Sequence, residues 1–332
     1  MSNAEQVCHA PEALAILRNN LGFVDEGLHR WVSFAIAENF KPVSAVPVNA
    51  CPDCGQPARV GLGRFISHST LMQLQECSCG VLWVNARVDA DTSAWHFDRA
   101  YRDDAYYATD RAAVFDQLAG IVARETRRGG LVLDVGGAGG QLAAAVRTRR
   151  PDLAITVQDV SRAKVAEAAT RGFLGIIGDD WMASEERYDA IILSDSIYYE
   201  PDLSALWDAV GRLRAPGGLI VLRVPNRVSV VRLVSWWQSR SKVLPVRLRG
   251  HNPDHLVICP RTYLERKLRE IGCDQIQVLP SPVGEGQRVP GFYAAARAWH
   301  RMTDQCLTPS MVVVGRHSQL KNREDRERRS SR

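Results

Sequence analysis

Short apolar runs that end in acidic residues or glycines recur through the middle of the chain. Continuous runs of this length are typical of strands buried on both faces of a parallel sheet, whereas half-exposed strands alternate apolar and polar positions. The segments that fit are residues 131–135, 155–160, 173–180, 188–194 and 215–226.

Segments with helical apolar spacing separate these runs. Residues 112–127 place Val114, Leu118 and Ile121 on one face, and the Ala-rich residues 142–150 stop before Pro151. Strands alternating with helices indicate an α/β fold with a parallel sheet. Beyond these segments we predict one or two helices within 11–40, a helix over 261–271, and two final antiparallel strands at 275–279 and 310–316.

The first apolar run ends in Asp134 and a glycine cluster, and Asp159 follows 25 positions later at the end of the second run. The carboxyl ends of neighbouring strands in such sheets border a ligand-binding crevice. A dinucleotide fingerprint would need a small residue where Leu142 stands, so it is not met. A glycine turn that only packs strand against helix is the alternative interpretation.

This arrangement resembles class I S-adenosylmethionine (SAM) methyltransferases, whose pattern is acid-x-Gly-x-Gly-x-Gly. Asp134, Gly136 and Gly140 match it, and Ala138 stands where the middle glycine is usual. The resemblance implies a Rossmann-like, doubly wound, seven-stranded sheet over residues 129–318, with SAM as cofactor.

The resemblance also implies roles for single residues. Asp134 and the glycine turn would border the methionine end of SAM, Asp159 would accept hydrogen bonds from the ribose hydroxyls, and Asp179 would face the adenine. Asp179 and Asp180 are alternatively solvated loop acids. The expected cofactor-binding set is Asp134, Gly136, Gly137, Ala138, Gly140, Asp159, Val160, Asp179, Asp180, Ser194 and Asp195.

A second motif lies upstream. Cys51 and Cys54 precede a glycine in a zinc-knuckle pattern, and Cys77 and Cys79 supply the other half of a four-thiolate structural zinc site. Only one residue separates the second pair, so His68 is an alternative ligand for one of them. Free, partly buried thiols are the other interpretation.

The two motifs together resemble bacterial SAM methyltransferases with an N-terminal cysteine zinc motif, including enzymes that C-methylate nucleotide-linked sugars. Segments 79–85, 101–107 and 255–264 share that resemblance. The predicted organisation is a helical segment (1–48), a small zinc-ribbon-like module (49–95), a helical connector (96–128), the SAM-binding domain (129–318) and a disordered charged tail (319–332).

Candidate catalytic residues follow the fourth strand and the later insertion. Tyr198 and Tyr199 are suited to orienting or deprotonating an acceptor hydroxyl, or else pack under the cofactor. His255 matches a histidine of the resembling family and can move a proton near neutral pH. It alternatively fixes a lid through a backbone hydrogen bond. His251 is a second candidate base.

Composition changes this interpretation little. The 332 residues carry a net charge of +5, but residues 321–332 hold six basic and three acidic side chains, so the rest is nearly neutral and nucleic-acid binding is disfavoured. A basic stretch at 223–249 is better interpreted as an insertion capping the active site than as a phosphate-binding surface.

No apolar run reaches about 20 residues, so no membrane partner is expected. The first residues lack a secretory pattern, and paired metal-type cysteines fit the reducing cytoplasm.

The sequence therefore predicts a SAM-dependent methyltransferase that acts on a small-molecule acceptor by C- or O-methylation, such as a nucleotide-sugar or a biosynthetic intermediate. One alternative is an RNA or tRNA methyltransferase whose zinc module grips nucleic acid. Another is a non-catalytic regulator that retains the fold. The sequence does not indicate an oligomeric state.

Overall fold

The computed structural model describes residues 45–67, 70–88, 104–226, 228, 255–282 and 291–317. The chain divides into two compact units. Of the described residues, unit 1 holds 45–88, 228 and 255–259, and unit 2 holds the rest. The expected helices within 11–40, the charged tail, His68 and His251 lie outside the described residues.

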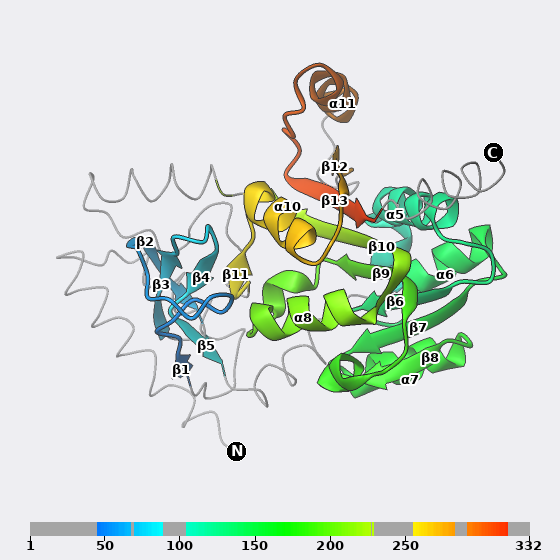
Figure 1. Ribbon diagram of the computed structural model, residues 1–332, viewed down its shortest axis with the longest axis horizontal. Coiled ribbons are helices and arrows are strands. Elements are labelled where there is room, and N and C mark those ends of the chain that lie inside the picture. Colours follow the sequence, from blue (N-terminus) through cyan, green and yellow to red (C-terminus); the bar gives the residue numbers. More distant parts are fainter. Residues whose placement is uncertain are drawn as a thin grey trace, which may run out of the picture. The chain divides into compact units, whose positions relative to one another are not determined.

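Unit 2 contains the predicted seven-stranded sheet (Figure 1), in the order β12-β13-β10-β9-β6-β7-β8. The five strands from β10 to β8 run parallel. β13 pairs antiparallel with β10, and β12 pairs antiparallel with β13. The strands are β6 (Leu131–Val135), β7 (Ala154–Asp159), β8 (Leu174–Ile177), β9 (Tyr188–Ser194), β10 (Arg214–Pro225), β12 (Gln275–Pro280) and β13 (Ser310–Arg316).

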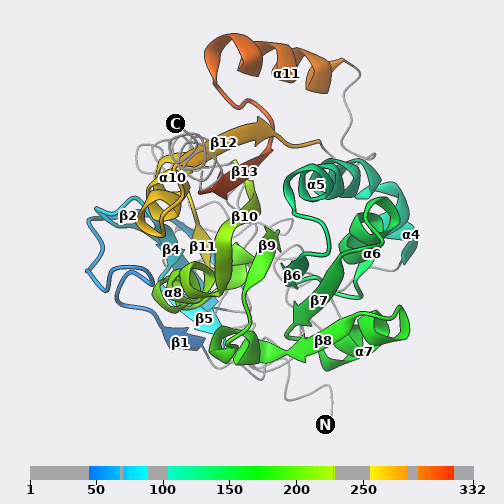
Figure 2. The same ribbon diagram turned by 45° about the vertical axis from the view of Figure 1, so that its right-hand side comes forward.

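Helices cover both faces of this sheet, which explains why its strands are apolar at successive positions (Figure 2). Helices α5 (Ala112–Glu125) and α6 (Gln141–Arg149) pack on each other, and their apolar residues share one core with Val132, Ile192 and Val221. α7 (Arg162–Thr170) contributes Ala168 to that core.

On the opposite face, α8 (Leu203–Leu213) and α10 (Arg261–Glu270) pair through a 2.9 Å hydrogen bond from the Trp207 indole to the Tyr263 hydroxyl. Both helices bury their apolar sides, including Leu206 and Val210 of α8 and Leu264 and Leu268 of α10.

The strand order reverses between β6 and β9. From β6 the chain proceeds outward to β7 and β8, and then returns to β9 on the other side of β6. A crevice at the carboxyl ends of the two strands at such a switch point is where open α/β sheets bind ligands. The glycine turn follows β6 at this edge, and residues 195–199 follow β9 there.

Two segments of unit 2 differ from the sequence prediction. The third strand ends at Ile177, and residues through Asp180 belong to a 3-10 helix, η2 (Gly178–Ala183). Gly178 has a φ of 64°, which ends the extended backbone, and the buried Trp181 fixes the new turn. Helix α11 (Phe292–Thr303) was not predicted, because its apolar positions lie between two short strands without capping signals. Unit 2 also holds α4 (Asp104–Thr109) and η3 (Ile197–Tyr199).

Unit 1 is built from two small sheets. β1 (Ala45–Pro47) pairs with β5 (Ala86–Val88), and a four-stranded sheet has the order β11-β4-β3-β2. Its strands are β2 (Val60–Ser67), β3 (Thr70–Glu76), β4 (Leu82–Val84) and β11 (Val257–Ile258). β11 belongs to the segment after β10, so the module predicted near the N-terminus also includes a later part of the chain. Within the described parts of the chain, no helix combines the length and the apolar character that a membrane crossing requires.

Candidate cofactor and metal sites

Asp134 lies at the end of β6 and is 1% exposed. Among the described residues no group hydrogen-bonds to its Oδ2, and the hydroxyls of Ser194 and Ser196 are likewise buried without a partner. Burial, and then the charge of Asp159, raise the pKa of the Asp134 carboxyl to about 7. A buried acceptor without a donor costs free energy, so this corner of the crevice is arranged for a polar ligand group.

The turn after β6 is packed too closely to carry side chains at Gly136 and Gly137. A Cβ on Gly136 would lie 2.5 Å from the Ser196 Cβ, and one on Gly137 would lie 2.8 Å from the Asp134 Oδ2. Gly136 and Gly140 also have φ values of 70° and 82°, a region that favours glycine. The turn therefore presents bare backbone directly beside the unpartnered Asp134 carboxyl.

Ala138, at the position where the resembling family usually has glycine, adopts a φ of 48°. Its amide donates a 2.9 Å hydrogen bond to the Asp159 Oδ2, which holds it in this conformation. A left-handed backbone costs an alanine about 1–2 kcal/mol. The turn therefore keeps its conformation with alanine in place of glycine at position 138, at the cost of backbone strain.

We expect Ala138→Gly to stabilise the protein by roughly 0.5–1 kcal/mol, because glycine adopts the positive φ without strain. Urea unfolding measures the change. The matched control is Ala143→Gly in the buried face of α6, where the same substitution should destabilise by about 1 kcal/mol. Equal destabilisation by both substitutions would contradict the assigned strain.

Asp159, at the end of β7, is 1% exposed and fixes the glycine turn. Its carboxylate accepts hydrogen bonds of 2.9 Å from the amides of Ala138 and Ser161. Gln158 adds two more links, accepting from the Gly136 amide at 2.9 Å and donating to the Gly178 carbonyl at 2.7 Å. We did not predict Gln158; its signal is a polar side chain directly before Asp159, at the carboxyl end of a buried strand. Binding of the ribose by Asp159 stays a prediction.

The remaining predicted cofactor residues follow neighbouring strands at the same edge. Val160 is 42% exposed directly after β7 and offers an apolar surface. Asp179 and Asp180 are exposed on η2, directly after β8. The structure thus brings the acid, the glycine turn and these three residues to the carboxyl ends of adjacent strands.

These features fit the cofactor that the resemblance implies. SAM carries an ammonium group, which requires acceptors such as the unpartnered Asp134 Oδ2. Its amino-acid part would lie beside the turn, where Gly137 has no side chain and packs directly against the Asp134 carboxyl. A flat adenine needs an exposed apolar contact, which Val160 supplies. The chemistry of the donor and acceptor set therefore matches the group.

Asp195, also predicted to bind cofactor, is held in an ion-pair cluster. Its carboxylate accepts hydrogen bonds from Arg111, at the start of α5, and from Arg223 on β10. Arg223 is 5% exposed and also donates a 2.8 Å hydrogen bond to Ser281. Burial favours the protonated acid, but the charges of Arg223 and Arg111 outweigh it and lower the pKa of Asp195 to about 2.

The ion pairs with Arg111 and Arg223 give Asp195 a structural role. Its φ of 60° is rare for aspartate and places the loop between Ser194 and Ser196 in a fixed conformation. Neither arginine was predicted as part of the site. Arg223 was counted with a basic stretch, but its guanidinium is buried rather than part of a charged surface.

The candidate catalytic tyrosines stand side by side on η3, with ring centroids 4.7 Å apart. Burial, followed by the charge of Asp195, raises the pKa of Tyr198 well above its ordinary value. Tyr198 therefore stays protonated near neutral pH, which suits it to donating a hydrogen bond and not to acting as a base. His255 is 6% exposed and lies in unit 1, directly before Leu256 and β11.

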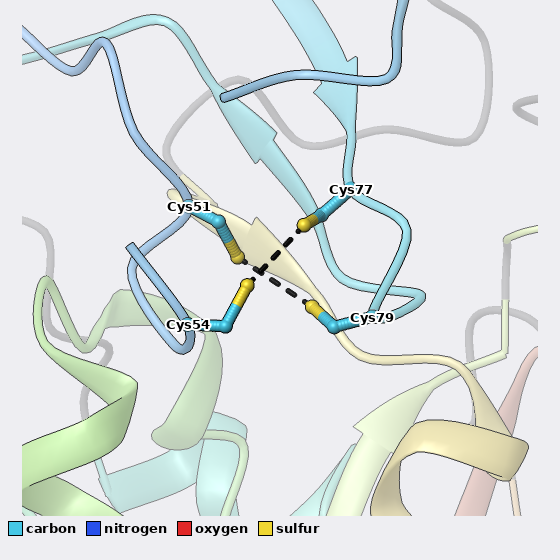
Figure 3. Close-up of side chains that lie close together, drawn as sticks. All are labelled: Cys51, Cys54, Cys77 and Cys79. Carbon is cyan, nitrogen blue, oxygen red and sulfur yellow. Dashed lines mark hydrogen bonds between the residues drawn. The ribbon is translucent and has the colours of Figure 1, made fainter. Parts of the chain in front are cut away.

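The four predicted metal ligands converge in unit 1 (Figure 3), and their sulfur atoms all lie within 4.8 Å of one another. The Cys51–Cys79 sulfurs are 3.6 Å apart and the Cys54–Cys77 sulfurs 3.4 Å. Four thiolates bound tetrahedrally at about 2.3 Å from zinc would lie about 3.8 Å apart. The single residue between Cys77 and Cys79 does not prevent convergence.

Two glycine turns shape this cluster. Gly55 and Gly80 have φ values of 70° and 95°, and their amides donate to the carbonyls of Cys51 and Cys77. Burial raises the pKa of Cys51 to about 11 and also raises that of Cys79. Several thiolates at such short separations need a cation between them, so the donor set fits a structural metal ion.

A family model described as a methyltransferase domain matches residues 106–278, slightly more than half of the chain. A search of curated proteins finds none that matches the sequence.

Three solved structures are similar at low identity. A SAM-dependent methyltransferase from Archaeoglobus fulgidus is 12% identical, with a TM-score of 0.42, and the match covers 61% of this chain and 94% of that one. An O-methyltransferase family protein from Burkholderia thailandensis is 15% identical, with a TM-score of 0.38 and coverages of 61% and 55%. A SAM-dependent methyltransferase from Thermotoga maritima is 14% identical, with a TM-score of 0.43 and coverages of 68% and 98%. These likenesses are distant. The family of the chain is taken from the family model that matches residues 106–278.

Proposed function

Because the chain belongs to the methyltransferase domain family, we propose that it transfers the methyl group of SAM to a small-molecule acceptor, through carbon or oxygen methylation. The observation that carries the proposal is the buried, unpartnered Asp134 Oδ2 beside a turn too tight for side chains at Gly136 and Gly137. The unpartnered acceptor suits a cofactor with an ammonium group, and the packed turn fixes the position of that acceptor.

When bound, SAM would supply a methyl carbon activated by the sulfonium, which an acceptor atom would attack in line as the carbon–sulfur bond breaks and S-adenosylhomocysteine leaves. The residues of the protein then have to position the acceptor and exclude water. Asp134 would bind the ammonium group, and Asp159 would hold the turn and accept from the ribose. Val160, Asp179 and Asp180 would flank the base.

Acceptor orientation would come from the segment after β9. The Asp195 cluster keeps this segment rigid, and Ser194 and Ser196 offer hydroxyls without hydrogen-bond partners among the described residues. Neither Asp195 nor Tyr198 is suited to accepting a proton near neutral pH, given the directions of their pKa shifts. A base, where the acceptor needs one, would come from another residue, and His255 stays the candidate from the sequence.

We further propose that Cys51, Cys54, Cys77 and Cys79 bind one structural zinc ion. Four sulfur ligands would fill the tetrahedral shell and leave no open position for catalysis.

The expected metal content is one zinc per chain, falling to none in the Cys51→Ser/Cys54→Ser variant. Elemental analysis of the purified protein measures it. Cys306→Ser, which changes a thiol in unit 2, is the control and should retain the zinc. A wild-type protein without zinc, when produced in zinc-containing medium, would contradict the site.

The acceptor class is tested by turnover. The protein is incubated with SAM and separate pools of hydroxyl-bearing metabolites, metabolites with acidic carbon positions, or tRNA, and formation of S-adenosylhomocysteine is measured. Turnover with a small-molecule pool is expected. Turnover with tRNA alone, together with binding that weakens steeply with salt, would replace the proposal with an RNA-directed activity.

A further inference from the structure

The segment that carries His255 joins the sheet next to the cysteine cluster, although 176 positions separate His255 from Cys79 in the sequence. β11 pairs antiparallel with β4, with Val257 opposite Trp83 and Ile258 opposite Leu82. The Val84 amide also donates a 2.9 Å hydrogen bond to the Leu256 carbonyl. β4 is therefore the support on which this segment rests.

β4 is a direct continuation of the second cysteine turn. It begins two residues after Gly80, and the Cys77 amide donates a 2.9 Å hydrogen bond to the carbonyl of Val81. The turn that holds two of the four sulfurs thus sets the position and direction of β4.

The other end of the segment is buried as well. Cys259 follows β11 and is 3% exposed. It directly follows Ile258, which pairs with Leu82 of β4, five residues after Cys77. Figure 3 shows the yellow strand β11 passing behind the four cysteines.

The segment has little stabilisation of its own. β11 has only two residues, and strands this short depend on their neighbours for stability. Yet His255, Val257, Ile258 and Cys259 are all at most 6% exposed, and Ile258 packs with Leu74, Leu82 and Val84. Their burial depends on β4, which the second cysteine turn precedes directly and which β3 supports on its other side.

We propose that the metal ion bound by the four cysteines fixes residues 255–259, and that zinc occupancy therefore controls the order of the segment carrying His255. This inference rests on the proposed zinc site, and the role of His255 as a candidate base rests on the proposed function. The cysteine cluster would then position a later part of the chain, in addition to stabilising the module that contains the cysteines.

Hydrogen exchange on the full-length protein tests this. Exchange in residues 255–260 is compared between wild type, wild type stripped of zinc with EDTA, and Cys54→Ser, with Cys306→Ser as the matched control. Cys54 is exposed, so its substitution removes a ligand without opening a buried cavity. Residues 188–194 of β9 report on unit 2, and zinc content is measured on every sample.

The expected result is exchange in residues 255–260 at least tenfold faster in both zinc-free samples, with residues 188–194 unchanged. Unchanged exchange at 255–260 after confirmed zinc loss would overturn the inference, as would equal acceleration in both segments. Titration of the same samples with S-adenosylhomocysteine tests the proposed function independently of the exchange result. Failure of wild type to bind it would refute the cofactor site in unit 2 while leaving the exchange result valid.

Discussion

Asp134→Asn is expected to weaken binding of S-adenosylhomocysteine about 100-fold, close to 2.7 kcal/mol. The carboxylate would pair with the ammonium group in a buried position, and removing one member of such a pair costs about 2–5 kcal/mol. The Asp134 Oδ2 has no hydrogen-bond partner among the described residues, so the loss falls on the ligand contact. Calorimetric titration of both proteins measures it.

Stability should move in the opposite direction. The pKa of Asp134 is raised to about 7, so between roughly pH 4 and 7 the folded protein holds a proton that the unfolded chain has lost. Wild-type stability therefore falls as pH rises through this window, by on the order of 2–3 kcal/mol between pH 5 and 8. Asp134→Asn should lack this fall and be the more stable protein at pH 8.

Ligand binding supplies the complementary test. A protonated Asp134 pairs poorly with an ammonium group, so wild-type affinity for S-adenosylhomocysteine should decrease as pH drops below about 7, and the variant should show no such decrease. Asp208→Asn, on the exposed side of α8, is the control and should leave affinity and stability unchanged. Equal affinities of wild type and Asp134→Asn would remove Asp134 from the site.

The second large effect is expected at the ion-pair cluster. Asp195→Asn should destabilise unit 2 by about 3 kcal/mol at pH 7, because two arginines, one of them 5% exposed, lose their shared carboxylate. Urea unfolding is the measurement. Asp116→Asn, which removes an exposed partner of Arg149, should change stability by less than about 0.5 kcal/mol.

The pH dependence of this effect follows from the lowered pKa. Asp195 titrates near pH 2 when folded and near pH 4 when unfolded, so its stabilisation is complete above about pH 4. It is lost as pH falls toward 2, where wild type and Asp195→Asn should converge in stability. A difference that stays constant from pH 7 to pH 2 would show that the cluster does not act through the Asp195 charge.

Local patterns predicted the parallel sheet and the cysteine cluster. The apolar runs at 131–135 and 188–194 have no other stable place than between two helical layers, and Asp134 and Asp195 lie at the carboxyl ends of β6 and β9, where the strand order reverses. Cys51 and Cys54 are separated by two residues, a spacing that is itself a metal-binding pattern, so the cysteine cluster could be predicted without any tertiary information.

Long-range partners could not be predicted in this way. Arg111 and Asp195 are 84 positions apart, and nothing in either local sequence signals the contact. β11 has two residues, too few to show any periodicity, and its pairing with β4 depends on the folded unit. The early end of β8 depends on Trp181 finding a buried position, which the run of apolar residues did not reveal.

The most direct test of the account is calorimetric titration of the full chain with S-adenosylhomocysteine, beside Asp159→Ala and an NAD control. The account predicts micromolar binding to wild type, loss of binding in Asp159→Ala and no binding of NAD. The absence of S-adenosylhomocysteine binding to a folded wild-type protein would contradict it.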